Sequence, residues 1–344
     1  MRCRFAAPVT PRCRGRHSRA TPAGPTAVHE IRRAWEHVER VRMLCAAIDI
    51  GSNTTRLLVA EPRDGQLKKA MEQRAYTRIN KAVADSGEIP AEKAEEVAGV
   101  VATQVRLARE LGAETIRAVA TAAIREAGNG AAVASAIEAE SGVPVDILSE
   151  QEEGRLSFLG ATKTLGHPVD GLIGVVDVGG GSTEVILGTV PGGVGEVRSW
   201  RVGSGLLADE LIASDPPSPA EIRKIRDRIE DLFAGVEIEQ PTQAVAVGGS
   251  ATSLRRLVGA VLEYETLERG IRVLCGDPAA DVARRFELDP RRVRILATGV
   301  LLLEKLSELL GQPLQIGKGG LREGVVLDLL NGSANGSSPE RLAA

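Results

Sequence analysis

Short apolar runs alternate with longer amphipathic segments through most of the chain beyond residue 42. Runs with the length and composition of buried strands are found at Leu44–Ile50, Leu57–Ala60, Ile116–Ala120, Val143–Leu148, Leu172–Val178, Val185–Leu187 and Gln243–Val247. Segments that read as helices are found at Ala91–Leu111, Gly130–Ser141, Glu150–Leu165, Pro219–Phe233, Arg291–Leu310 and Gly320–Leu330. Strands that alternate with helices in this way predict an α/β architecture.

One stretch of the chain is repeated. The segment Ala47–Thr55, AIDIGSNTT, is echoed by Val175–Thr183, VVDVGGGST, with aspartate matching aspartate and glycine matching glycine. Each copy reads as an apolar strand, an aspartate, a glycine turn and a second strand. One such hairpin is a common turn, but two in one chain predict duplicated domains that face each other across a cleft.

The residue types in these two turns suit the binding of phosphate. Glycine lets successive backbone N–H groups approach an anion closely. Hydroxyl groups add further donors, at Ser52, Thr54, Thr55, Ser182 and Thr183. Asp49 and Asp177 stand at the strand ends, where carboxylates can hold a hydrated Mg²⁺ or Mn²⁺ that would screen phosphate charge. A third turn, Gly248-Gly249-Ser250, opens a helix that continues through Ser253–Val258, and its N-terminus offers another anion site.

Each of these signals also has an ordinary structural interpretation. A single Asp-x-Gly after a strand is usually only a turn, and a glycine pair such as Gly248-Gly249 is more often a helix start than a phosphate site. The run Asp177–Glu184 is far more specific. The functional hypothesis therefore rests on the two matched loops together.

Composition and charge argue against nucleic acids and membranes as binding partners. The chain of 344 residues has a net charge of -3, but residues 1–42 carry ten arginines and three glutamates, so the remainder is acidic. An acidic body predicts no general nucleic-acid binding. Aromatic residues make up only 2%, which disfavours base stacking. No apolar run has the length of a membrane span, and the four cysteines show no disulfide or metal-ligand spacing, so a cytoplasmic location is expected.

The first 42 residues are rich in Arg, Pro and small residues and lack the apolar core of a secretory signal. They are interpreted as a disordered extension, with Met43 near the true start of translation. Residues 332–344 are expected to be a disordered tail.

Seven motifs together resemble the exopolyphosphatase/guanosine pentaphosphate phosphohydrolase family of the actin-like and sugar-kinase-like superfamily. They are IDIGSNTTRLLVAE, VATAAIREAGN, SEQEEGRLSFLGA, VVDVGGGSTE, SDPPSPAEI, VGGSATSL and GLREGVVLDLL, in family order between Ala46 and Leu330. The resemblance implies two duplicated actin-like (ribonuclease H-like) domains that face an interdomain cleft. The expected domains are residues 43–168 with about 317–331 returning to them, and residues 169–316.

The resemblance also implies roles for individual residues. Glu153 matches the catalytic glutamate that would orient or deprotonate the attacking water. Glu152 beside it would raise the pKa of Glu153 or help to hold the metal. Asp49, Asp177 and Glu184 match the metal- and water-positioning carboxylates. Arg125 matches an arginine that contacts the phosphate chain, and Arg78 is a weaker candidate for the same contact. The phosphate-binding set is Gly51, Ser52, Asn53, Thr54, Arg125, Gly179, Gly180, Gly181, Ser182, Thr183, Gly248, Gly249 and Ser250.

Two departures from the family pattern bear on function. The family often has Leu-Gly-Glu-Gly where this chain has Ile79-Asn80-Lys81-Ala82, which weakens the case for Arg78. The sequence also stops soon after the second domain, without the extra helical domains of longer members that help to hold long polymers. A preference for short or medium chains is therefore expected.

The function expected from the sequence is exopolyphosphatase activity, the release of terminal orthophosphate from short inorganic polyphosphate by water attack assisted by Mg²⁺ or Mn²⁺. Hydrolysis of guanosine pentaphosphate is the main alternative. An ATP-dependent kinase is a third reading, but no sugar or carboxylate pocket is evident for it. A non-catalytic nucleotide sensor is a fourth, and the retained acidic residues oppose it. The family suggests a homodimer.

Overall fold

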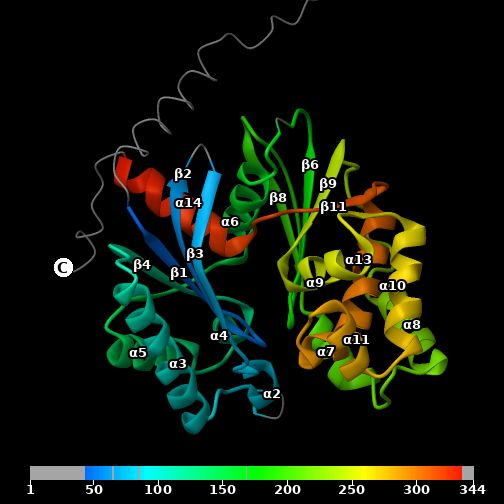
Figure 1. The fold of residues 1–344 in the computed structure, drawn as a ribbon, viewed down its shortest axis with the longest axis horizontal. Helices are drawn as coiled ribbons and strands as arrows, with labels where there is room; N and C mark the ends of the chain where they lie inside the picture. The colour runs from blue at the N-terminus through cyan, green and yellow to red at the C-terminus, as the bar shows by residue number, and fades with distance from the viewer. Residues whose placement is uncertain (1–42, 64–65, 84–85, 168, 335–344) are drawn as a thin grey trace, which may run out of the picture.

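A computed structural model describes residues 43–63, 66–83, 86–167 and 169–334 of the chain. Figure 1 shows two lobes side by side, each built around one sheet. The predicted extension at 1–42 and the last ten residues of the predicted tail lie outside the described residues. No helix in the described part of the chain combines the length and apolar character that a membrane crossing requires.

The first lobe contains a five-stranded mixed sheet in the order β3-β2-β1-β4-β5. Its strands are β1 (Cys45–Ile50), β2 (Thr55–Arg63), β3 (Gln66–Ala75), β4 (Thr115–Ala120) and β5 (Val145–Ile147). The first three strands form an antiparallel meander, and β4 and β5 continue the sheet in parallel with β1. Alternate residues of β1 point to opposite faces of the sheet, so the strand contributes to two separate cores.

The second lobe repeats this topology. Its sheet has the order β10-β11-β9-β6-β7-β8. The strands are β6 (Ile173–Val178), β7 (Thr183–Thr189), β8 (Gly193–Trp200), β9 (Gln243–Val247), β10 (Val261–Leu262) and β11 (Leu314–Ile316). Strands β6, β7 and β8 form the meander, and β9 and β11 run parallel to β6. The duplication inferred from the repeated Asp-Gly segments is thereby confirmed, and the chain is an α/β protein with two actin-like domains.

Helices cover the outer face of each sheet. In the first lobe they are α2 (Ile79–Val83), α3 (Ala91–Glu110), α4 (Ala122–Arg125) and α5 (Gly130–Ser141). In the second lobe they are α7 (Ser204–Leu211), α8 (Pro219–Leu232), α9 (Gly248–Val258), α10 (Tyr264–Gly276), α11 (Ala279–Phe286), α12 (Pro290–Arg294) and α13 (Leu296–Leu310). Helix α13 is buried along most of its length and forms the centre of the largest apolar core.

Two helices pack on the inner faces of the sheets, between the lobes (Figure 1). These are α6 (Glu150–Lys163) and α14 (Leu321–Ala334). Leu156 of α6 belongs to a core with β1, β2 and α14, whereas Phe158 and Ala161 belong to a core with β6, β7 and β9. Helix α6 therefore contacts both sheets, and any side chain at its N-terminal end is positioned by both lobes.

The sequence pattern located most of the long elements and missed several others, among them β11, α7, α10 and the edge strands β3 and β8. Strands β3 and β8 were not predicted because they lie at sheet edges and carry mostly polar or small residues. The predicted helix Arg291–Leu310 was wrong in being continuous, since α12 ends at Arg294 and α13 begins at Leu296. The Thr298 hydroxyl donates to the Ile295 carbonyl at 2.7 Å, a side-chain bond of the kind that bends helices. The predicted tail also starts too early, because α14 continues to Ala334.

Candidate active site

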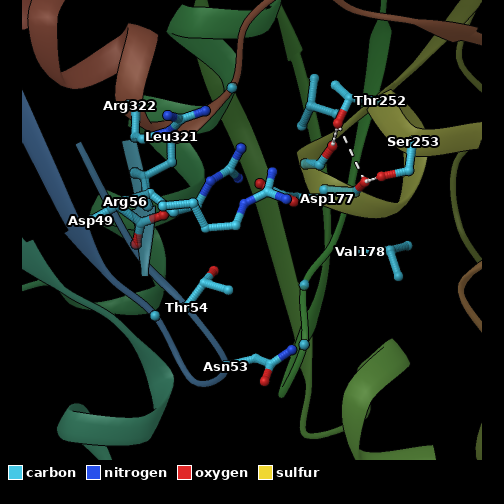
Figure 2. Close-up of a pocket in the computed structure, with 18 of the residues that line it drawn as sticks. Asp49, Asn53, Thr54, Arg56, Asp177, Val178, Thr252, Ser253, Leu321 and Arg322 are labelled. Carbon is cyan, nitrogen blue, oxygen red and sulfur yellow. Dashed lines mark hydrogen bonds between the residues drawn. The ribbon is translucent and has the colours of Figure 1, made fainter. Parts of the chain in front are cut away.

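A cavity of about 460 Å³ lies between the two sheets at the ends of β1 and β6. Both matched hairpin loops line it, together with the start of α9, the segment that leads into α14, and Glu153 of α6. Figure 2 shows the cavity from a viewpoint where Asn53 and Thr54 of the first loop lie opposite Val178 of β6 and Thr252 and Ser253 of α9. Both copies of the sequence repeat thus contribute residues to one space.

The two Asp-Gly loops have the same backbone turn. The Gly51 amide donates to the Thr54 carbonyl at 3.1 Å, and the Gly179 amide donates to the Ser182 carbonyl at 3.0 Å. The loops also touch, because a Cβ atom added at Gly181 would lie only 2.5 Å from the Ser52 hydroxyl. Glycine is therefore required there for the close approach of the lobes. The result is two backbone turns of the type that binds anions, one on each side of the cavity.

Three carboxylates come from the inner faces of the two meanders. Asp49 and Asp177 occupy matching positions on β1 and β6, and Glu184 of β7 pairs directly with Asp177. Burial, with the charge of the nearby Asp49 as the next contribution, raises the pKa of Asp177 to about 6. Burial also raises the pKa of Asp49, and it raises that of Glu184 well above its usual range, with Glu153 and Asp177 adding to the effect. The cluster therefore holds more negative charge than its own surroundings neutralise.

Glu153 supplies the fourth carboxylate, from the first turn of α6. Ser149 caps this helix by accepting from the Glu152 amide at 3.2 Å. Glu153 is 8% exposed, and its Oε2 accepts from Nη1 of Arg125 at 2.7 Å. The pKa of Glu153 is raised to about 7, because burial, helped by the charges of Asp49 and Asp177, outweighs the hydrogen bond and charge of Arg125, which lower it. A carboxylate with a pKa near neutrality can take up and release a proton at working pH.

A row of positive side chains extends from the carboxylates. Arg56 of β2 pairs with Asp49 of β1, and Arg74 of β3 pairs with Arg56, so all three side chains project from the same sheet face. Arg322 of α14 and Arg292 of α12 line the same cavity. Figure 2 shows Arg56 beside Asp49 and below Arg322.

These positive charges are crowded, and among them Arg322 forms an ion pair with Glu72 at 3.2 Å. Burial lowers the pKa of Arg56 to about 9, with the charges of Arg322 and Arg74 contributing, and burial lowers that of Arg292 to about 10. Nε of Arg292 is buried and has no hydrogen-bond partner in the described part of the chain. A bound polyanion would neutralise the repulsion between these arginines and accept a hydrogen bond from the unpaired Nε of Arg292.

The sequence motifs did not indicate a binding role for this row of arginines. A charged residue inside an apolar run is the available signal, since Arg56 interrupts the strand TRLLVA and Arg322 precedes the apolar segment of α14. Arg74 and Arg292 give no such signal because β3 was not recognised and α12 was merged into a longer helix.

Most of the predicted residues line the cavity. They are Asp49, Gly51, Ser52, Asn53, Thr54, Glu153, Asp177, Gly179, Gly180, Gly181, Ser182, Glu184, Gly248 and Gly249. The others lie outside it. Thr183 is fully buried and donates to the Val202 carbonyl, and the Thr55 hydroxyl pairs with Thr77. Ser250 is 1% exposed and its hydroxyl lies 3.3 Å from that of Ser204.

Glu152 and Arg125 differ from expectation. Successive helical residues point about 100° apart, so with Glu153 in the cavity Glu152 points elsewhere. The Glu152 carboxylate accepts two bonds of 2.8 Å from Arg155, which lower its pKa. Arg125 does not line the cavity but binds Glu153 and the Leu148 carbonyl. The exposed Arg78 side chain also lies outside the cavity, although its amide donates to the Asn53 carbonyl.

Mg²⁺ or Mn²⁺ as cofactor stays a prediction. No group of three or more acidic, histidine or cysteine side chains is arranged as a metal site within the described residues. Mg²⁺, however, is commonly bound by one or two carboxylates, substrate phosphates and its own waters. Asp49 and Asp177 fit that pattern, because both reach the cavity and both carry charge that a cation would neutralise.

The fold and the cavity together define an enzyme of the actin-like class that acts on phosphate groups. A sequence profile narrows the class further, since residues 58–332 match the Ppx/GppA phosphatase family. The chain belongs to the Ppx/GppA phosphatase family.

Individual relatives agree with this assignment. Exopolyphosphatase 1 of Mycobacterium leprae is 29% identical over 318 residues, which cover 86% of this chain and 92% of that protein. The crystal structure of the Aquifex aeolicus Ppx/GppA family member has a TM-score of 0.70 and 29% identity, and the match covers 84% of this chain and 97% of that one. The structure of an exopolyphosphatase from Cytophaga hutchinsonii has a TM-score of 0.74 at 19% identity, with coverage of 84% and 98%, and supports the fold alone.

Proposed function

We propose that this phosphatase is an exopolyphosphatase that releases terminal orthophosphate from short inorganic polyphosphate. The observation that carries the proposal is the separation of charge in the cavity, with carboxylates at one end and arginines leading away from them. Carboxylates and anion-binding loops meet at one end, and a row of arginines leads away from that end within the same 460 Å³. A chain of phosphates presents only charge and oxygen acceptors, which this arrangement can satisfy along its length.

In the proposed reaction the terminal phosphoryl group lies between the two Asp-Gly loops. Backbone amides near Gly51 and Gly179 bind its oxygens, and the Ser52 hydroxyl adds a donor. Arg56, Arg74 and Arg292 hold the following phosphates and fix the direction of the chain. The bond that breaks then lies close to the carboxylates, where positioning and charge neutralisation supply most of the rate.

Glu153 acts as the general base in this proposal. It accepts the proton of the attacking water on a carboxylate oxygen, while Arg125 binds Oε2 and holds the side chain in one orientation. The negative charge of Asp177 raises the pKa of Glu153, which makes its carboxylate a stronger base toward the attacking water. When bound by Asp49 and Asp177, Mg²⁺ or Mn²⁺ would neutralise charge on the phosphate oxygens.

The cavity wall disfavours ATP as the main substrate. No phenylalanine, tryptophan or tyrosine lines the cavity in the part of the chain that the structure describes. A purine base would find no aromatic surface on which to stack. Weak or absent ATPase activity is therefore part of the proposal.

Guanosine pentaphosphate is a second candidate substrate. The cavity extends along α9, where Thr252, Ser253 and Arg256 face it, and reaches Leu288 beyond. These side chains offer hydrogen-bond partners and one apolar contact, which a ribose or a guanine edge could use. The extension therefore favours this alternative over ATP-like nucleotides that depend on stacking.

A direct comparison of substrates tests the proposal. Phosphate release is measured from tripolyphosphate, long-chain polyphosphate, guanosine pentaphosphate and ATP, with Mg²⁺, with Mn²⁺ and with a chelator. We expect the highest kcat/KM for tripolyphosphate, the lowest for ATP, and loss of activity in chelator. Because binding is largely ionic, KM for tripolyphosphate should also rise with salt. A clear preference for guanosine pentaphosphate would overturn the assignment in favour of the second candidate.

A further inference from the structure

A contact between the two lobes lies at the outer end of the row of arginines. Tyr76, in the linker between β3 and α2, lies against Arg291 of α12, with the guanidinium carbon 3.9 Å from the centre of the ring. We propose that this pair is a clamp that closes the outer end of the cavity and selects short polyphosphates. The inference rests on the proposed function for its substrate, but the clamp itself rests on the contacts below.

The guanidinium group is held in place for this contact. Asp289 accepts from Nε of Arg291 at 3.2 Å, from Nη2 at 2.9 Å and from the Arg291 amide at 2.9 Å. This bidentate pairing fixes the plane of the guanidinium. Little side-chain freedom is therefore lost when the guanidinium stacks on the ring of Tyr76. The contact is therefore preformed on the side of the second lobe.

On the side of the first lobe, the linker that carries Tyr76 is attached to the first phosphate loop. Beyond Tyr76 the Arg78 amide donates to the Asn53 carbonyl at 3.0 Å and the Asn80 amide donates to the Ser52 carbonyl at 3.0 Å. Arg78 has a φ of 48°, which is unusual for a residue other than glycine. The ring of Tyr76 thus lies two residues before a segment that is bonded to the loop proposed to bind phosphate.

The clamp stands where the arginine row leaves the cavity. Arg74 precedes Tyr76 by two residues, Arg292 follows Arg291 directly, and both line the cavity. Tyr76 and Arg291 do not line it, so the stacked pair lies at the margin of the cavity, next in the chain to two arginines that do. A polyphosphate that leaves the cavity between Arg74 and Arg292 would have to separate the pair, whereas a short chain would end inside it.

The clamp also opposes a repulsion. Arg74 and Arg292 come from different lobes, and the charge of Arg74 contributes to the lowered pKa of Arg292. Without ligand this repulsion favours separation of the lobes, and the stacked pair offsets it. A short polyanion placed between the two arginines removes the repulsion and leaves the clamp closed, so closure and short-chain binding reinforce each other.

The kinetic test uses Arg291→Ala, because this side chain is largely exposed and its loss should leave the fold intact. KM for tripolyphosphate should rise about fivefold. The ratio of kcat/KM for long-chain polyphosphate to that for tripolyphosphate should rise by at least the same factor. Tyr76→Ala should behave alike, whereas Tyr76→Phe, which keeps the ring, should match the wild type. An unchanged ratio in both Arg291→Ala and Tyr76→Ala would overturn the inference.

Matched controls are present in the chain. Tyr264 is 67% exposed at the start of α10, and Arg284 is exposed on α11 with only a local ion pair to Asp281. Neither lines the cavity. Tyr264→Ala and Arg284→Ala should therefore leave both KM and the length ratio unchanged.

Hydrogen exchange separates this inference from the proposed substrate. In Arg291→Ala without ligand, amides in 76–80 and 289–294 should exchange faster than in the wild type, because both sides of the clamp are released. Unchanged exchange in both segments would contradict the clamp. If the wild type releases no phosphate from any polyphosphate, the proposed function fails, and the exchange measurement alone then decides on the clamp.

Discussion

Glu153 shows how its surroundings set the chemistry of one residue. Burial alone would hold its carboxyl protonated, the Arg125 guanidinium favours the charged form, and the balance gives a pKa of about 7. A general base works in its deprotonated form, so activity that depends on Glu153 should be present above this pKa and lost as the pH falls through it.

Removal of Arg125 should move this pH dependence. In Arg125→Met the pKa of Glu153 should rise, because the neighbour whose hydrogen bond and charge favour the ionised form is gone. The acid limb of kcat/KM should therefore shift to higher pH by about one unit or more. Arg125→Lys, which retains the charge, should shift it less.

Arg155→Met provides the control for that profile. Arg155 lies on the same helix but pairs with Glu152 and Asp328 outside the cavity. Its acid limb should coincide with that of the wild type. An acid limb at the wild-type pH in Arg125→Met would mean that Arg125 does not set the ionisation of Glu153.

The roles of residues in the two repeated loops were predictable from the sequence. The roles of Glu152 and Arg125, which lie outside the repeat, were predicted less well. The matched loops and their aspartates were found because two copies of one pattern exclude coincidence. Glu152 was misplaced because the sequence shows it next to Glu153, whereas helix geometry turns it toward Arg155. Arg125 was assigned to phosphate because it matches a phosphate-contacting arginine of the family, whereas in the fold its guanidinium donates to Glu153.

At the scale of elements, the position of Glu153 depends on the contact between α6 and α14. Glycines allow this contact, because a Cβ atom at Gly324 would collide with the Leu156 carbonyl and one at Gly160 with the Gly320 carbonyl. Leu156 is one turn beyond Glu153, so the two backbones that touch here also fix the catalytic end of α6.

Gly324→Ala should therefore destabilise the protein and reduce its activity. Overpacking of this kind costs about 1–3 kcal/mol, and α6 should shift away from the cavity. Gly99→Ala is the matched control, because a Cβ at Gly99 in the middle of α3 meets nothing within 4 Å. That change should instead stabilise by about 0.5–1 kcal/mol through helix propensity. Urea unfolding of both variants measures the difference, and equal stabilities would contradict this account of the contact.

Element prediction succeeded where burial imposes a clear period. Strand β9 and helix α5 match the predicted ranges in full, because each has an apolar face bounded by turn residues. Edge strands such as β3 lack that signal, since solvent on one side permits polar residues at most positions. The break at Ile295 coincides with a Thr298 side-chain bond to its carbonyl, which periodicity does not reveal.

At the scale of the whole molecule, the two lobes repeat one topology but differ in charge. The row across the first meander is Asp49, Arg56 and Arg74, and the matching row across the second is Asp177, Glu184 and Ser199. The aspartates match between the two rows, whereas the residues that pair with them differ in charge. One lobe therefore supplies cations for the phosphate chain, and the other supplies carboxylates to the reaction centre.

Other predictions about the whole molecule stay predictions. The homodimer, the cytoplasmic location, the choice between Mg²⁺ and Mn²⁺ and the domain boundaries at residues 168 and 316 depend on properties beyond the contacts of one chain. Helix α6 precedes the first of those boundaries, and its apolar residues pack in cores of both lobes.

A comparison of Glu153→Gln with Glu152→Gln tests the assignment of Glu153 as the general base. These glutamates are neighbours on α6, but only Glu153 lines the cavity. Glu153→Gln should lower kcat for tripolyphosphate at least about 100-fold, while Kd from calorimetry stays within about twofold, because a base is lost and no phosphate donor is removed. Glu152→Gln should retain nearly the wild-type rate. A near wild-type rate in Glu153→Gln, or an equal loss in Glu152→Gln, would contradict the assignment of Glu153 as the base.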